Sequence, residues 1–312
     1  MEELNRYRGS MLGLAVGDAL GTTVEFKPPG SFEPVTDIVG GGPFRLPVGA
    51  WTDDTSMALC LAESLLEKRA FDPTDQLERY VRWWREGHLS STGHCFDIGG
   101  ATSASLARFE STGEPYPGDR FTDAGGNGAL MRLAPVPLAF ASDPAEAIER
   151  AALSARATHG MVQSTDGCRY FAGLIVGALH GVSKEELLYG DPYHPAKEGW
   201  GEPGLHIEIR EVAAGSFLRR QPPDINGSGY VVRSLEAALW ALARTDNFRD
   251  GALAVVNLGH DADTTGAIYG QLAGAIHGAE NIPAEWLDKL IMKEEIEAMA
   301  YELFELSREL TE

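Results

Sequence analysis

Two short acidic motifs carry the residues best suited to chemistry in this chain. Near the C-terminal end, Asp261-Ala262-Asp263-Thr264-Thr265-Gly266 places two carboxylates one residue apart and follows them with two hydroxyls. Trp51-Thr52-Asp53-Asp54-Thr55 offers the same oxygen ligands ahead of another apolar run. Oxygen donors that converge on one point are what Mg²⁺ and Mn²⁺ prefer. Carboxylates held together without cations would repel one another, so a shared site predicts about two divalent metal ions.

Both motifs stand directly before segments that we expect to be helical. These segments are residues 56–68 and the run of small and apolar residues that reaches Gly278. A carboxylate at a helix N-terminus is commonly a cap, because unpaired N–H groups and the helix dipole favour an anion there. One cap residue is enough for one helix, so capping explains a single Asp better than two Asp beside a threonine. We therefore favour a shared metal site over two sets of caps.

Glycines spaced four residues apart mark three segments in which helices are expected. The stripes are Gly13, Gly17 and Gly21 in a first helix over 6–20, Gly173, Gly177 and Gly181, and Gly266, Gly270, Gly274 and Gly278. Each glycine in a helix interior costs about 1 kcal/mol relative to alanine. We predict that these helices pack with unusually close backbones and that this packing draws the acidic motifs together, by extension from small-residue packing in membranes. The alternative is weak helices that tolerate glycine.

Further helices are expected where apolar residues recur with the helical period. They cover residues 74–85, 100–109, 144–158, 161–179, 231–243 and 293–312, and Gly125-Gly126-Asn127-Gly128 is expected to open another that runs through Arg132. Residues 190–204 are irregular, and are either a lid or a surface insertion. We find no strand with convincing alternation, no tandem repeat and no linker, so the sequence predicts one all-α domain over residues 1–312.

Composition places the chain among soluble globular proteins. It is 44% hydrophobic and 23% charged, and no apolar run approaches the roughly 20 residues that span a bilayer. The N-terminus lacks the pattern of a signal peptide, and the three cysteines have no zinc-like spacing, so we expect a reduced, cytoplasmic compartment. The net charge of −20 argues against a general nucleic-acid or membrane binder. It still allows a small anionic ligand beside metal ions and backbone amides.

Together with other motifs, the two acidic motifs resemble the ADP-ribosylglycohydrolase family. In the family's order, the motifs are GDALG at 17–21 with Glu25, TDDT at 52–55, GHCFDIG at 93–99, GGNGALMR at 125–132, Thr158-His159, Gly227-Ser228-Gly229-Tyr230 and DADTTG at 261–266. The resemblance covers most of the chain. It implies a compact orthogonal multi-helix fold and a hydrolase that cleaves an N- or O-glycosidic bond to ADP-ribose. We expect this enzyme to be a monomer.

The resemblance also implies roles for individual residues. A pair of Mg²⁺ or Mn²⁺ ions would be held by Thr52, Asp53, Asp54, Asp261, Asp263 and Thr264. Glu25, Asp97 and Asp53 are the candidates for the catalytic step, either as general acid–base groups or as stabilisers of an oxocarbenium-like state. Substrate contacts are expected from Asp97, Gly125, Asn127, Gly128, His159, Gly229 and Tyr230.

Several of these residues also have an ordinary structural interpretation. Asp97 would be the N-cap of the next helix, and His159 would complement the dipole of a helix end. Tyr230 is either a base-stacking ring or a buried staple residue. The glycine loop before Arg132 is a weak pattern for an anion cradle. Arg132 itself is expected to pair with a carboxylate rather than to bind phosphate.

Two rival functions follow from the same residues. His260-Asp261 suggests an HD-type metal phosphohydrolase, but that fold needs further histidines and leaves TDDT unexplained. The other rival is an inactive ADP-ribose-binding or crystallin-like helical protein, in which a lost site should show damaged ligands. All six expected metal positions retain oxygen donors. Relatives act on ADP-ribosylated arginine, serine, nucleic-acid ends and small esters with nearly the same motifs, so the motifs define the bond and not the acceptor.

Overall fold

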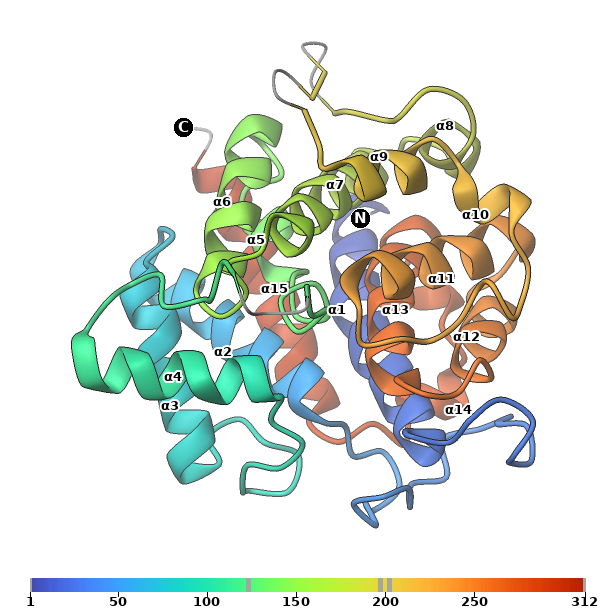
Figure 1. The fold of residues 1–312 in the computed structure, drawn as a ribbon, viewed down its shortest axis with the longest axis horizontal. Coiled ribbons are helices and arrows are strands. Elements are labelled where there is room, and N and C mark those ends of the chain that lie inside the picture. The colour runs from blue at the N-terminus through green and yellow to red at the C-terminus, as the bar shows by residue number, and fades with distance from the viewer. Residues whose placement is uncertain (1, 122–124, 196–198, 201–203, 311–312) are drawn as a thin grey trace.

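The computed structural model describes residues 2–121, 125–195, 199–200 and 204–310, and within them the all-helical fold is confirmed (Figure 1). Apart from three isolated bridges, these residues hold no β-structure. The α-helices are α1 Glu2–Gly21, α2 Asp53–Lys68, α3 Pro73–Glu86, α4 Gly100–Thr112, α5 Pro135–Ala139, α6 Pro144–Arg156, α7 Val162–Leu179, α8 Lys184–Leu188, α9 Ile207–Ala213, α10 Ser216–Arg219, α11 Val231–Arg244, α12 Phe248–Val256, α13 Ala262–His277, α14 Ala284–Leu287 and α15 Lys293–Glu309. Short 3₁₀ turns, η1 Thr22–Val24 and η2 Ala279–Asn281, follow α1 and α13.

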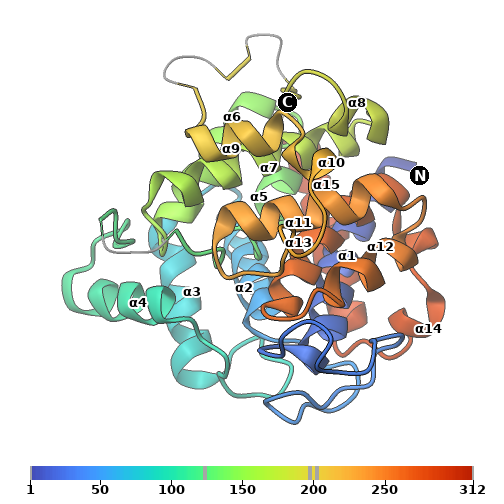
Figure 2. The same cartoon turned by 45° about the vertical axis from the view of Figure 1, so that its right-hand side comes forward.

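Helices α1 and α13 lie side by side through the middle of the molecule (Figures 1 and 2). A glycine of one helix faces a glycine of the other in three successive pairs, Gly9 with Gly274, Gly13 with Gly270 and Gly17 with Gly266. A Cβ on any of these six glycines would overlap the carbonyl oxygen of its opposite number. The predicted close approach of backbones is confirmed for this pair, which we call the glycine seam.

The third glycine stripe does not behave in this way, and the prediction of close helix backbones is wrong for α7. A Cβ on Gly177 would lie 2.7 Å from side-chain atoms of Leu187 and Tyr193. A Cβ on Gly173 would lie 3.2 Å from Pro195 Cδ and 3.3 Å from Trp200 Cη2. These glycines make room for side chains of the segment that follows α7. Residues 196–198 and 201–203 of the predicted irregular stretch lie outside the described residues.

The predicted helix through Arg132 is also absent, because residues 126–132 form turns and the next helix begins at Pro135. One contact with another loop and a local turn hold the backbone in this shape. The Asn127 N–H donates to Gly229 O at 3.1 Å, while the Asn127 carbonyl accepts from the N–H groups of Leu130 and Met131 at 2.8 and 3.1 Å. Tertiary hydrogen bonds therefore override the local preference for helix.

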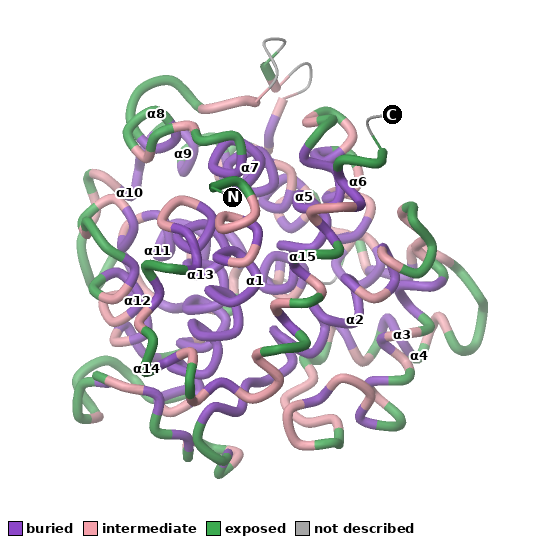
Figure 3. The backbone as a smooth tube through the Cα atoms, turned by 180° about the vertical axis from the view of Figure 1, so that it is seen from behind, coloured by how far each residue is buried: buried purple, intermediate pink, exposed green. Residues whose placement is uncertain are grey.

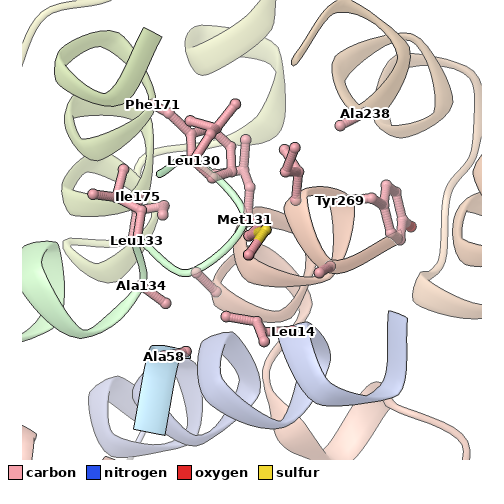
Figure 4. Packing of buried hydrophobic residues seen from close by; sticks show 14 of the residues in the cluster. Leu14, Ala58, Leu130, Met131, Leu133, Ala134, Phe171, Ile175, Ala238 and Tyr269 are labelled. Atoms are coloured by element: carbon pink, nitrogen blue, oxygen red, sulfur yellow. The ribbon is translucent and has the colours of Figure 1, made fainter. Parts of the chain in front are cut away.

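The core surrounds the glycine seam and is built from helices along the whole described chain (Figure 3). Leu14 of α1, Met131, Phe171 of α7 and Tyr269 of α13 point into it from different directions (Figure 4). The remaining predicted helices are confirmed with small differences at their ends, and the closing helix stops at Glu309. In the part of the chain that is described, none of the helices has the length and apolar character that crossing a membrane requires.

Candidate metal and substrate site

The glycine seam brings acidic residues from three segments to one end of α1 and α13. A Cβ on Gly21 would overlap the backbone of Ala262, so the end of α1 touches the start of α13. Asp18 lies one turn before Gly21, Glu25 follows η1, and Asp263 lies in the first turn of α13. Asp53 and Asp54 form the first turn of α2. The two acidic motifs, distant in sequence, therefore meet as predicted.

Two overlapping groups of three carboxylates result. Asp18, Asp54 and Asp263 each place one oxygen within 4.8 Å of the others, and all three residues are buried. Glu25, Asp97 and Asp263 form the second group under the same distance limit. Asp263 belongs to both groups and joins them. We call the five residues together the carboxylate cluster; they are Asp18, Glu25, Asp54, Asp97 and Asp263.

Asp18 is the cap of helix α2, although it lies on a different helix. Its carboxylate accepts from the backbone N–H of Thr52 at 2.9 Å and of Thr55 at 3.1 Å, and from the Thr55 hydroxyl at 2.6 Å. Neither Thr52 nor Asp261, the residues at the N-cap positions of α2 and α13, makes a side-chain capping bond. The capping interpretation of the acidic motifs is therefore wrong at the N-cap positions themselves. With α2 capped by Asp18, the carboxylates of Asp53 and Asp54 are left for another purpose.

The carboxylate cluster carries more negative charge than the described protein groups balance. Asp54 Oδ1, Asp263 Oδ1 and Glu25 Oε2 are buried and have no hydrogen-bond partner among the described residues. Burial first, and then neighbouring carboxylates, raise the pKa of Asp54 and Asp263 well above the usual range. The same two causes raise the pKa of Glu25 to about 12 and that of Asp97 to about 8. A buried charge is costly unless it is paired, and carboxylate oxygens suit hard divalent cations, so the residues present fit such a metal.

The other expected ligands lie close to the cluster. The Thr52 hydroxyl is 2.8 Å from Asp54 Oδ2 and 3.0 Å from Asp18 Oδ1. Asp53, Asp261 and Thr264 line the adjacent cavity, in which Asp53 is 7% exposed and Thr264 is 6% exposed. Direct ligation by these four residues, and by Asp54 and Asp263 of the cluster, remains a prediction.

A cavity of about 410 Å³ lies against the cluster, within the usual range for small-molecule sites. Its lining includes four acidic residues, Glu25, Asp53, Asp97 and Asp261, which we call the acidic side of the cavity. The lining also includes residues of the glycine loop and of Thr158-His159, namely Asn127, Gly128 and His159. A second cavity, of about 620 Å³, shares Phe26 and Asp261 with the first and is also lined by Ser228, Gly229 and His260.

The two loops predicted to contact substrate are joined to each other. Besides the bond from Asn127 N to Gly229 O, the Val231 N–H donates to Gly125 O at 2.9 Å. The Asn127 side-chain amide donates to Asp261 Oδ2 at 2.7 Å, which links the loops to the acidic motif. The Tyr230 ring lies against Gly125, and its hydroxyl donates to Glu208 Oε2 at 2.6 Å. Gly125 and Tyr230 line neither cavity.

Sequence reasoning missed two residues of the site, Asp18 and Phe26. Asp18 had a signal, because it is a lone charged residue in the apolar and glycine-rich run 11–21. Phe26 had none, yet it is 64% exposed at the boundary of both cavities. Its backbone is left-handed (φ 61°), as are those of Asp97 (φ 61°) and His260 (φ 57°). Such strained residues gather at functional sites.

His260 is held by its backbone and does not take part in the carboxylate cluster. Its carbonyl accepts from Phe26 N at 2.6 Å, and its N–H donates to Lys27 O at 2.7 Å. The His260 side chain is exposed at the second cavity. Neither group of potential ligands within the described residues contains a histidine, in contrast to what an HD-type phosphohydrolase needs.

Fold and site define an all-helical protein whose buried carboxylates suit divalent cations. A model of the family described as ADP-ribosylglycohydrolase matches residues 1–311, and the chain belongs to this family. It is 41% identical to the ADP-ribosylarginine hydrolase Tri1 of Serratia proteamaculans, over 99% of this chain and 81% of that protein. It is 35% identical to the ADP-ribosyl-[dinitrogen reductase] glycohydrolase of Rhodospirillum rubrum, over 94% of this chain and 92% of that protein. A solved structure of an "ADP-ribosylglycohydrolase-related protein complex" superposes with a TM-score of 0.86 and 47% identity, covering 98% of this chain and 99% of the other.

These comparisons confirm the family resemblance, the fold class and the reaction class. The chain is an enzyme that hydrolyses a glycosidic bond to ADP-ribose. The alternatives of an HD-type phosphohydrolase and of an inactive crystallin-like protein are therefore wrong.

Proposed function

We propose that the protein removes ADP-ribose from a modified arginine by hydrolysing the N-glycosidic bond to its guanidinium group. The acceptor is inferred from relatives. Besides the Serratia protein, the ADP-ribosylarginine hydrolase Tri1 of Pseudomonas putida is 39% identical over 100% of this chain and 81% of its own length. The ADP-ribosylhydrolase ARH3 of Gallus gallus is only 26% identical over 96% of this chain.

The observation that carries the mechanism is the pair of carboxylate groups that share Asp263. This arrangement supports a dinuclear Mg²⁺ or Mn²⁺ centre held by Asp54 and Asp263, with Thr52, Asp53, Asp261 and Thr264 completing the ligand set. When bound, such ions polarise substrate oxygens and lower the pKa of bound water. Asp18 then acts as a partner that keeps the first turn of α2 in position, through its bonds to Thr52 and Thr55.

The acidic side of the cavity supplies the acid–base groups. Glu25 is 3% exposed, lines the cavity and keeps Oε2 without a hydrogen-bond partner in the described chain. We assign Glu25 the transfer of a proton, either from the attacking water or to the leaving group. Asp97 and Asp53, which line the same cavity, are assigned to stabilising the positive charge that develops on the ribose.

Other residues position the substrate. Asn127, Gly128 and His159 line the same cavity and are assigned to the pyrophosphate and ribose oxygens of ADP-ribose. Gly125 and Gly229 keep the two loops in register, and Tyr230, beside Gly125, is assigned to the adenine ring. These roles make the acidic side the site of bond cleavage and leave binding of the nucleotide to the loops.

A panel of defined substrates tests the proposal. ADP-ribose linked to arginine, to serine, to a nucleic-acid end and to a small ester would each be incubated with the enzyme and Mg²⁺ or Mn²⁺. We expect fastest release from arginine, and a Glu25→Gln variant that is slower by about 10²–10⁴ with ADP-ribose affinity little changed. Preferential release from serine or the ester would overturn the proposal that arginine is the acceptor. Wild-type turnover by Glu25→Gln would remove Glu25 from the mechanism.

A further inference from the structure

Arg132 is a fully buried cation with no carboxylate partner among the described residues. Its exposed fraction is 0%, and the expected ion pair is absent from the described ion pairs. Instead, the guanidinium group lies 4.7 Å from the centre of the Tyr80 ring and 3.8 Å from the sulfur of Met57, and its Nε has no hydrogen-bond partner in the described chain. Burying an unpaired charge is costly, so a purpose beyond packing is expected.

The guanidinium group instead connects two parts of the cavity lining. Arg132 Nη1 donates to the Gly128 carbonyl at 2.9 Å, which fixes the glycine loop. Arg132 Nη2 donates to the Thr158 hydroxyl at 2.7 Å, and that hydroxyl lies 2.8 Å from His159 Nδ1. The backbone of Thr158 and His159 is held as well, because the Ser105 hydroxyl donates to Thr158 O at 2.9 Å and His159 N donates to Ala155 O at 2.7 Å.

This chain of hydrogen bonds determines where the imidazole proton lies. The Thr158 hydroxyl has one proton, and Arg132 already donates to its oxygen, so the acceptor available for that proton among the described residues is His159 Nδ1. A neutral imidazole that accepts at Nδ1 carries its own proton on Nε2. We propose that Arg132 is a positioning residue that acts through Thr158 to hold His159 in the Nε2–H form, so that the ring always offers an N–H donor to the ligand.

The surroundings of His159 agree with such a role. The ring lines the 410 Å³ cavity, and a Cβ on Gly128 would lie 2.7 Å from its Cε1 and 3.1 Å from its Nε2. A side chain at position 128 would therefore crowd the Nε2 side of the ring, and Gly128 leaves this side free of such a contact. Burial first, and then the charge of Arg132, lower the pKa of His159 to about 3, which keeps the ring neutral near pH 7. The identity of the ligand, ADP-ribose, rests on the proposed function.

Nitrogen-15 NMR of histidine-labelled, ligand-free protein tests the tautomer directly. We expect His159, assigned by comparison with a His159→Gln sample, to show an unprotonated Nδ1 and a protonated Nε2. A Thr158→Val variant, which keeps the shape but removes the hydroxyl, should show a mixture of the two tautomers. Thr158→Ser, which keeps the hydroxyl, should restore the single form. A protonated Nδ1 in the wild type, or a Thr158→Val spectrum identical to it, overturns the proposal.

Binding of ADP-ribose, measured by calorimetry on the same proteins, supplies the second readout. Thr158→Val should weaken binding roughly tenfold, as the loss of one well-aligned hydrogen bond does, and Thr158→Ser should restore it. Arg132→Gln should reproduce the mixed tautomers, and a folded Arg132→Gln protein that keeps the single form overturns the role of Arg132. If this variant does not fold, Thr158→Val still tests the hydroxyl through which Arg132 acts. Unchanged affinity in Thr158→Val contradicts the proposal. If the wild type binds no ADP-ribose but the wild type and the variants show the expected tautomers, the proposed function fails and the role of Arg132 stands.

Discussion

The glycine seam and the glycines of α7 share one sequence pattern and differ in what fills the space. In the seam, Gly13 and Gly270 let two helix backbones touch, whereas Gly173 and Gly177 of α7 receive the side chains of Trp200 and Tyr193. Only the seam ends at the carboxylate cluster. A four-residue glycine spacing thus predicts that one face of the helix lacks side chains. Whether this face helps to position a functional site depends on what packs against it, a second helix backbone or the side chains of another segment.

The largest effect is expected from Gly270→Ala in the middle of the seam. The new methyl group would overlap the backbone of Gly13, which cannot turn aside as a side chain can. We expect a loss of stability of roughly 4 kcal/mol or more, measured by chemical denaturation. Gly100→Ala, at a helical position with nothing within 4 Å of the added Cβ, is the matched control and should unfold like the wild type.

The charge gathered at the end of the seam predicts how stability varies with pH. Burial raises the pKa of Asp18 to about 6 and that of Asp97 to about 8, so these two groups of the cluster bind more protons in the folded than in the unfolded chain between about pH 4 and pH 8. The melting temperature of metal-free protein should therefore fall as the pH rises through this range. Saturating Mg²⁺ should remove most of the fall. A metal-free protein that gains stability from pH 4 to pH 8 would contradict the unbalanced charge of the cluster.

A smaller effect is expected from Asp18→Asn. This variant tests whether Asp18 supports the metal site indirectly, by keeping the first turn of α2 in position. An asparagine keeps the size but cannot accept all the bonds that Thr52 and Thr55 donate, so the first turn of α2 should loosen. We expect Mn²⁺ affinity to fall by about 10- to 100-fold, as when a partner of a metal ligand is lost. Calorimetric titration measures this. Unchanged affinity would leave Asp18 as a helix cap alone.

The smallest effect is expected from Gly177→Ala in α7. Its added methyl group would meet the ends of the Leu187 and Tyr193 side chains, which are able to move. The cost should be about 1–2 kcal/mol, well below that of Gly270→Ala, with metal affinity unchanged. A loss as large as that of Gly270→Ala, in the same denaturation experiment, would remove the distinction between the two glycine faces.

The sequence predicts the helices, the seam and the meeting of the acidic motifs because each leaves a local trace. Apolar periodicity marks the helices, and the spacing of Gly13, Gly17, Gly266 and Gly270 marks the close approach. The predictions were wrong where contacts with residues distant in sequence determine the local structure. The loop at Asn127 forms turns because it bonds to Gly229 and Asp261. The neighbours of α7 and of Arg132 are likewise set by segments that no local pattern identifies.

The central claim is that the glycine seam brings carboxylates together to bind divalent cations that the reaction needs. Equilibrium dialysis of EDTA-treated protein against Mn²⁺, followed by metal analysis and by assay on ADP-ribosylarginine, tests this claim most directly. The account predicts about two ions per chain, no turnover without them, and loss of both binding and turnover in Asp263→Asn, whose carboxylate belongs to both groups. A chain that binds no ion and keeps full activity after EDTA would contradict it.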